Sequence, residues 1–294
     1  MIACRFVEDH QSEYPITRLC RLVGLSRARF YRYLAPPSPA ALARQVAVDL
    51  LVGVIDDIYV SSRRTYGVPR VWGQLRRRGY LVTRKTVAKL MRQQGYVGAH
   101  TRKRWRRGHR DVAPFGDWLN RQFHAEQPNE RWVADITEFS TGEGKLFLAG
   151  IRDLCHRGIV GWAIGEHQDA ALVVDALTMG LGRTAVDADG LVHHSDKGTQ
   201  YTSNEFVMAA GHARLQLSFG STGDCFDNAA METFWARLKT EIAWIRGSTH
   251  FDTRDQARRY LFEFIEVFYN RQRHQTGLGH LTPAEYATKF RHHT

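Results

Sequence analysis

Three carboxylates in the second half of the chain, Asp135, Asp196 and Glu232, are placed where an acid requires a partner. Asp135 lies in the middle of a predicted strand at residues 131–140, between two apolar residues. Burying a carboxylate there without hydrogen bonds, a basic neighbour or a metal is costly. Asp196 ends the apolar run LVHHS and opens the polar loop DKGTQYTS. Ligand sites gather at such carboxyl ends of strands.

Glu232 belongs to a predicted long helix at about residues 228–245. At about 100° per residue, the apolar side chains of this helix form one stripe. Asn228, Glu232 and Lys239 follow one edge of that stripe, and Asp227 has the residue type of an N-cap. We expect a carboxylate on this edge to reach the end of the sheet without leaving solvent entirely.

Three carboxylates at one sheet edge favour a divalent-metal site. Carboxylate oxygens suit Mg²⁺ or Mn²⁺ better than zinc, and two such ions serve phosphoryl transfer. Adjacent residues on a strand point to opposite faces, so His193 and His194 are predicted to be structural or to support the ligands. Other acids of this half have simpler readings as turn, helix-start or strand-end residues: Asp153, Asp187, Asp189, Asp252 and Asp255.

The elements that would position these acids can be read from short apolar runs and turn signals. Three strands joined by short turns predict an antiparallel meander, at residues 131–140, 146–154 and 158–165. Helices at 170–181 and 203–214 then alternate with strands at 191–195 and 215–219. The predicted fold class is α/β, a mixed sheet flanked by helices and preceded by an all-α region.

The charge is divided unevenly along the chain. The 294 residues carry a net charge of +11, yet residues 1–120 hold 23 Lys+Arg against 8 Asp+Glu and residues 121–294 hold 18 against 22. A polyanion-binding front joined to a carboxylate-bearing back would have this pattern, as would a merely solvated basic surface. No apolar run is long enough to span a membrane, and four scattered cysteines indicate a reducing cytosol.

The front half contains two helix-turn-helix candidates. In residues 14–34, Gly24 ends a first short helix and Ser26 caps a second one that carries Arg27 and Arg29. After a Pro-rich linker and a helix at 40–59, the outline repeats with Thr83 as the cap of a helix that carries Arg84 and Lys85. A small structural helical bundle is the alternative for both.

A basic arm follows the second candidate. Residues 101–110, TRKRWRRGHR, hold six Lys/Arg and one Trp. Arg104 and Arg106 are predicted to contact DNA phosphates, and Trp105 either stacks on the nucleic acid or docks on a neighbouring domain.

Three motifs together resemble a known family. WVADIT around Asp135, HHSDKGTQYTS around Asp196 and STGDCFDNAAMETFWARLKTE around Glu232 are similar to bacterial insertion-sequence transposases, whose catalytic core is shared with retroviral integrases. Thirty-five residues separate Asp196 from Glu232, the spacing of the D,D-35-E group, and Lys239 stands where a basic residue is expected. The resemblance extends to YGVPRVWGQLRRRGY and to YNRQRHQTGLGHLTPAEY, and so covers nearly the whole chain.

The resemblance implies a ribonuclease H-like core in which Asp135, Asp196 and Glu232 bind two Mg²⁺ (or Mn²⁺) ions. It also implies cleavage at insertion-element ends and transfer of the 3′-OH into DNA. Lys239 would hold a DNA phosphate, Asn228 would orient Glu232 or a DNA end, and the loop with Lys197 and Gln200 would contact DNA. The implied domains are 1–60, 61–110 with the arm, a linker at 111–127, the core at 128–245 and a C-terminal helical extension at 246–294.

The implied partners are double-stranded DNA, an upstream-frame product or fusion, and at least one further copy of the chain on DNA, without a membrane. The implied location is the cytoplasm, in association with the nucleoid. Two departures limit the carry-over: the His/His/Cys/Cys zinc set of retroviral relatives is missing, and Gln275 stands two residues after Arg273, where a His is common. The C-terminal motif is therefore left outside the active site. A nuclease without strand transfer and an inactive DNA-binding remnant are the rival functions.

Overall fold

The computed structural model describes residues 2–100, 125–184, 190–220 and 229–291. It divides into two compact units, Met1–Val54 and Ile55–Thr294, which are described separately. The arm residues Arg104 and Arg106, with Trp105, lie outside the described residues, as do Asn228 and Asp227.

The first unit contains the first predicted helix pair, α2 (Ile16–Leu22) and α3 (Arg27–Leu34), together with α1 (Ile2–His10) and the first part of α4 (Pro39–Ser61). The Ser26 hydroxyl accepts a bond from the Arg29 amide, which confirms the predicted cap. Helix α1 was not predicted, because only Cys4 and Val7 of its residues are fully buried and no long apolar stripe marks it. These helices share one small core: Cys4, Val7, Leu19, Cys20, Leu25 and Phe30.

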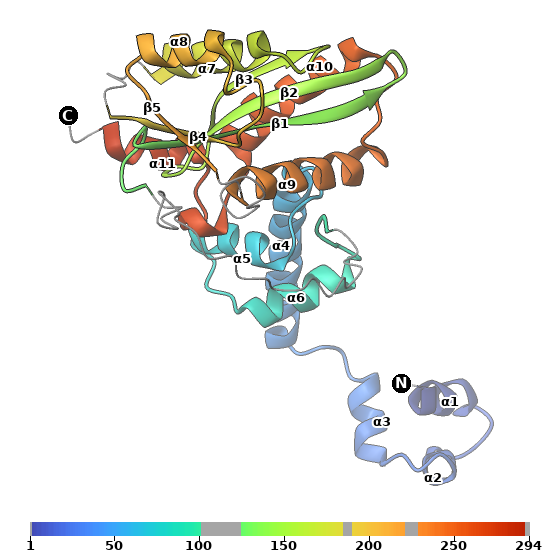
Figure 1. Ribbon diagram of the computed structural model, residues 1–294. Helices are drawn as coiled ribbons and strands as arrows, with labels where there is room; N and C mark the ends of the chain where they lie inside the picture. Colours follow the sequence, from blue (N-terminus) through green and yellow to red (C-terminus); the bar gives the residue numbers. More distant parts are fainter. Residues whose placement is uncertain (1, 101–124, 185–189, 221–228, 292–294) are drawn as a thin grey trace, which may run out of the picture. The chain divides into compact units, whose positions relative to one another are not determined.

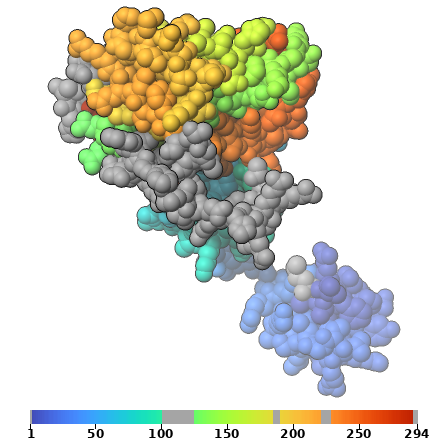
Figure 2. Space-filling model, in the orientation of Figure 1, coloured from blue at the N-terminus to red at the C-terminus, as the bar shows by residue number. Residues whose placement is uncertain are grey.

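The second unit begins with the second predicted helix pair, α5 (Val68–Arg77) and α6 (Arg84–Gln93). Helix α6 starts at the predicted cap, since Thr83 accepts a bond from the Thr86 amide. It turns Val87, Leu90 and Met91 inward and its charged residues outward. Part of the α5–α6 surface, cyan in Figure 2, is exposed on the face shown.

The sheet that follows has five strands: β1 (Arg131–Thr141), β2 (Gly144–Asp153), β3 (Ile159–Gly165), β4 (Val192–Ser195) and β5 (Gln216–Phe219). Their order is β3-β2-β1-β4-β5. The first three pair antiparallel, whereas β4 runs parallel to β1 and to β5. The predicted meander and mixed sheet are therefore confirmed.

Each face of the sheet has its own core (Figure 1). One face, with Trp132, Ala134 and Ile151, packs against α7 (Ala170–Thr184) and α8 (Asn204–His212). The other face packs against α9 (Ala229–Arg246), α10 (Arg254–Glu263) and a π-helical continuation at Phe264–Gln272. The stripe of α9 is buried as predicted: Met231, Phe234, Trp235, Leu238 and Ile242. Each such side chain contributes about 1.5–3 kcal/mol by leaving water.

The C-terminal part adds a short 3₁₀ turn at Thr276–Leu278 and helix α11 (Pro283–Arg291). Among the described residues, no single helix has the length and apolar composition of a membrane span. One bent pair, α3 with α4, meets that test by length and composition only.

Candidate active site

The register of β1 and β4 brings Asp135 and Asp196 together. These neighbouring parallel strands pair Val133 with His194. Two residues further along, Asp135 therefore lies beside Asp196, which directly follows β4. Neighbouring strands are about 4.8 Å apart. The predicted juxtaposition at the carboxyl end of β4 is thus a property of the sheet.

Asp135 is held by two hydrogen bonds on the face covered by α9. The amide of Ile136 donates to Oδ1 at 2.8 Å, and the indole Nε1 of Trp235 donates to Oδ2 at 3.0 Å. Burial and the negative charges of Asp196 and Glu232 nevertheless raise the pKa of Asp135 to about 6, against the lowering effect of those two bonds. Both other acids are therefore close enough to Asp135 for their charges to act on it.

Glu232 reaches this group from the first turn of α9, where its side chain is exposed. Strand β2 fixes that turn, because the guanidinium of Arg152 donates to the carbonyl of Ala230 at 2.6 Å. Arg152 is buried and donates also to the carbonyl of Arg157. Two residues before Glu232, the helix is thus tied to the sheet.

The donor set of this site fits a divalent cation. It offers three carboxylates, and none of the three forms an ion pair with a lysine or arginine of the described chain. Like charges gathered beside a half-buried acid are relieved by a cation. As placed, the side chains are near one another without forming a ready coordination sphere, since no cluster of three acidic, His or Cys ligands is found in the described ranges.

The other residues predicted beside the triad have separate positions. The amine of Lys239 lies 5.5 Å from the centre of the Phe139 ring, four residues along β1 from Asp135. Lys197 is exposed next to Asp196. Gln200 donates its amide to the carbonyl of Gln168 at 2.9 Å, which fixes the loop after Asp196 against the segment before α7.

The rival acids and histidines have structural surroundings. Asp153 ends β2 and accepts bonds from the amides of Asn129, Cys155 and His156 at 2.6, 2.8 and 3.0 Å. The His194 ring bonds to Ser218 at 2.9 Å, and burial lowers the pKa of His193 to about 4, so that ring is neutral. Both findings agree with a structural role.

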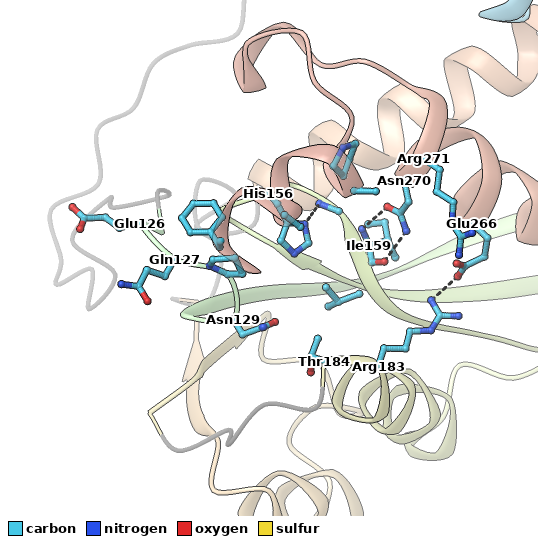
Figure 3. A pocket seen from close by; sticks show the side chains of 17 residues that line it. Glu126, Gln127, Asn129, His156, Ile159, Arg183, Thr184, Glu266, Asn270 and Arg271 are labelled. Carbon is cyan, nitrogen blue, oxygen red and sulfur yellow. Dashed lines mark hydrogen bonds and ion pairs between the residues drawn. The ribbon is translucent and has the colours of Figure 1, made fainter. Parts of the chain in front are cut away.

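A cavity of about 990 Å³ lies elsewhere in this unit (Figure 3). Its walls include Asn129 before β1, Ile159 at the start of β3 and Arg183 near the end of α7. Asn129 thus lies where the parallel strands β1 and β4 begin, whereas Asp196 lies where β4 ends. Several of its polar groups already have partners: Arg183 pairs with Glu266 at 2.6 Å, and the side chain of Asn270 bonds to both backbone groups of Ile159. None of the three carboxylates lines it.

The sequence did not reveal a charged junction between α5 and the core. Arg273 is buried and donates to fully buried Glu241 of α9 at 2.6–3.1 Å. Arg70 of α5 comes within 4.0 Å of the same carboxylate. A glutamate on the buried side of α9 was the available signal, because such an acid requires a cationic partner.

The motifs YGVPRVWGQLRRRGY and YNRQRHQTGLGHLTPAEY pack together around this junction. The Tyr66 hydroxyl accepts a bond from the His274 amide at 2.6 Å, and Arg77 donates to Glu285 and to the carbonyl of His280. Gly73 is required at this contact, because a Cβ there would lie 2.0 Å from the His280 ring. The C-terminal motif therefore forms the seat of α5.

Comparison with known proteins identifies an HTH-like region followed by an integrase core. Residues 125–225 and 232–290 each match a family model described as an integrase core domain, and residues 47–104 match an HTH-like domain. The chain is 34% identical over 286 residues to the transposase InsF for insertion sequence IS3A of Escherichia coli (strain K12), covering 97% of this chain and 98% of that protein. The chain belongs to the family of insertion-sequence transposases. The resemblance inferred from its motifs is confirmed.

A second relative of this transposase is the insertion element IS600 uncharacterized 31 kDa protein of Shigella sonnei, 35% identical over 278 residues, 92% of this chain and 98% of that protein. Among solved structures, the catalytic core domain of BIV integrase aligns with a TM-score of 0.43 and 18% identity over 56% of this chain and 97% of that one. The function of the chain, given by its similarity to the InsF transposase over nearly its full length, is DNA transposition. The transposase presents Arg27 and Arg29 on α3, and Arg84 and Lys85 on α6, as exposed side chains.

Proposed function

We propose that this transposase cleaves and joins DNA with Asp135, Asp196 and Glu232 as its catalytic and metal-binding residues. The observation that carries the proposal is the electrostatics of Asp135, whose pKa is raised by burial and by the other two acids. Negative charges gathered around Asp135 at one sheet edge favour the binding of a cation. Two divalent ions, Mg²⁺ or Mn²⁺, would supply activation of an attacking oxygen and stabilisation of a leaving one.

The reaction consists of two in-line displacements at phosphorus. Water first replaces the 3′ oxygen of a DNA strand at the element's end and frees a 3′-OH. That 3′-OH then attacks a phosphate of a second DNA, forming one phosphodiester as another breaks. No covalent bond to the protein forms, so the side chains need only hold and orient. Asp135 stays fixed by Ile136 and Trp235, and Glu232 follows the anchored first turn of α9.

DNA contacts complete the proposal. The exposed cations of α3 and α6 would bind phosphates of the element's end, and Lys197 would do so beside Asp196. Lys239 and Gln200 would contact the DNA near the metal ions, as would Asn228 and the arm residues Arg104 and Arg106. Joining two element ends in one complex would require at least a dimer on DNA, and an upstream-frame product or fusion would take part.

The test is joining of a labelled element-end oligonucleotide with Mg²⁺ or Mn²⁺, with and without an upstream-frame partner. We expect Asp135→Asn, Asp196→Asn and Glu232→Gln each to lower joining at least about a thousandfold, because each removes a ligand of the reacting centre. Binding of the oligonucleotide should change little. Asp255→Asn is the matched control, since that acid is exposed on α10 and paired with Arg259.

Unimpaired joining by any one of the three variants would remove that residue from the site. Cleavage without joining by the unmodified chain would favour a nuclease instead, and binding without either reaction would indicate an inactive copy.

A further inference from the structure

Trp235 connects two of the proposed catalytic carboxylates through one turn of helix. Its indole donates to Asp135 at 3.0 Å, and it follows Glu232 by three residues on α9. Three residues in an α-helix correspond to about 4.5 Å of rise. The hydrogen bond therefore fixes α9 against β1 at the point where both acids must meet the same ligand.

Gly150 provides the space for that ring. It lies opposite Asp135 in the antiparallel register of β1 and β2. A Cβ at this position would come within 2.8 Å of Cη2 and 3.2 Å of Cζ2 of Trp235. Both atoms belong to the six-membered ring of the indole, which extends beyond the reach of a phenylalanine. The glycine thus leaves room for the tryptophan ring, with Met231 Cε as the next nearest atom at 3.4 Å from the same point.

We propose that Trp235 is a positioning residue of this transposase, which sets the separation of Asp135 and Glu232 by donating its indole N–H to Asp135 from a seat at Gly150. The proposal rests on the proposed function of the two acids. Arg152, which ties Ala230 to β2, fixes the same turn of α9 from the other side.

The structure offers a matched control on the same helix. Trp244 of α9 also uses its indole N–H, donating to the carbonyl of Arg64 at 2.9 Å, but it contacts neither acid. Trp235→Phe and Trp244→Phe therefore each remove one indole hydrogen bond from α9 and keep an aromatic ring. Only the first should affect the site.

The experiment uses full-length protein and three measurements: Mn²⁺ binding by calorimetry, single-turnover joining of a pre-cleaved element end, and the unfolding temperature. For Trp235→Phe we expect Mn²⁺ affinity and the joining rate each to fall about tenfold, since a hydrogen bond to a charged group is lost. The unfolding temperature should fall further in Trp235→Phe than in Trp244→Phe, because Trp235 is buried and Trp244 is exposed, so both variants are compared at a temperature where each is fully folded. Equal Mn²⁺ affinity and equal joining rates in the two variants would overturn the proposal.

Gly150→Ala keeps the indole but displaces it, and so tests the seat independently of Trp235→Phe. We expect it to weaken Mn²⁺ binding in the unmodified chain and to have no further effect in the Trp235→Phe background, where the colliding atoms are gone. Additive losses would contradict the seat.

A spectroscopic measurement separates this proposal from the proposed function. The indole N–H resonance that disappears in Trp235→Phe should shift in Asp135→Asn if the hydrogen bond exists, whether or not the chain joins DNA. An unshifted resonance would overturn the proposal and leave the function of the acids standing. A shifted resonance in a chain whose three acids bind no Mn²⁺ would instead refute the proposed function.

Discussion

Helix α9 carries two glutamates with opposite surroundings. Glu241 is fully buried and takes three hydrogen bonds from Arg273, with Arg70 nearby. Glu232 lies nine positions earlier on the same helix. It is exposed and has no ion-pair partner among the described residues. The buried glutamate has its own cations, whereas no lysine or arginine of the described residues forms an ion pair with Asp135, Asp196 or Glu232.

The sheet repeats this contrast. Asp153 at the end of β2 is fully buried and satisfied by three backbone amides, while Asp135 of β1 is raised in pKa by burial and by two like charges. A carboxylate that stabilises the fold thus differs in its partners from the carboxylates that we propose to bind a metal ion. This distinction leads to three mutational tests.

The largest effect on stability is expected at the junction. Glu241→Gln leaves Arg273 buried beside Arg70 without a counter-charge, which should lower the free energy of unfolding by about 3–5 kcal/mol. Glu232→Gln, on the same helix, should change it by less than about 0.5 kcal/mol, as for most exposed substitutions. Urea denaturation of the two variants measures both. Similar losses would contradict the division of α9 into a structural and a functional glutamate.

Asp135 and Asp153 should respond in opposite directions in metal-free buffer. Asp153→Asn weakens three bonds to buried amides and should lose about 2–3 kcal/mol of unfolding free energy. The folded-state pKa of Asp135, about 6, lies above its ordinary value of 3.8, so ionising it opposes folding. This penalty begins as the pH rises through the ordinary value and is complete above the folded value.

Asp135→Asn should therefore be more stable than the unmodified chain at pH 8, by about 1–2 kcal/mol after the loss of one hydrogen bond. This advantage should be lost as the pH falls below the ordinary value of 3.8, where the unmodified acid becomes protonated in both states and only the lost hydrogen bond remains. Urea denaturation across this pH range provides the measurement. A variant less stable than the parent at pH 8 would show that the bonds from Ile136 and Trp235 outweigh the repulsion.

The sequence predicted the parts of the site that depend on local pattern. Apolar runs placed β1 and β4, the 100° period placed Glu232 on the edge of α9, and three motifs selected the acids. It did not predict that Trp235, counted only as an apolar residue of the stripe, donates to Asp135. That bond depends on how α9 packs across β1 and β2, which no local period encodes.

The division of charge along the sequence does not show which cations are paired within the fold. The charge division predicted a polyanion-binding front half or a merely solvated basic surface, yet among the described residues three of its cations pair with acids of the core: Arg63 with Glu263, Arg70 with Glu241 and Arg77 with Glu285. These partners are far apart in sequence and come together only in the folded chain, where the segment from Arg63 to Arg77 packs against α9, α10 and α11. Part of the front-half excess therefore stabilises the transposase internally.

The smallest effect separates the two kinds of cation on the helix pair α5–α6. Arg84→Gln and Lys85→Gln remove exposed α6 charges that have no ion-pair partner among the described residues, so each should reduce the slope of log affinity against log salt by about 0.9 if it contacts a phosphate. Arg77→Gln removes a charge of α5 that Glu285 already neutralises, and should leave the slope unchanged. Electrophoretic mobility shifts with an element-end duplex at several salt concentrations measure all three. An equal loss of slope in the α5 and α6 variants would mean that DNA competes with the core for Arg77, and the separation of structural from DNA-binding cations would fail.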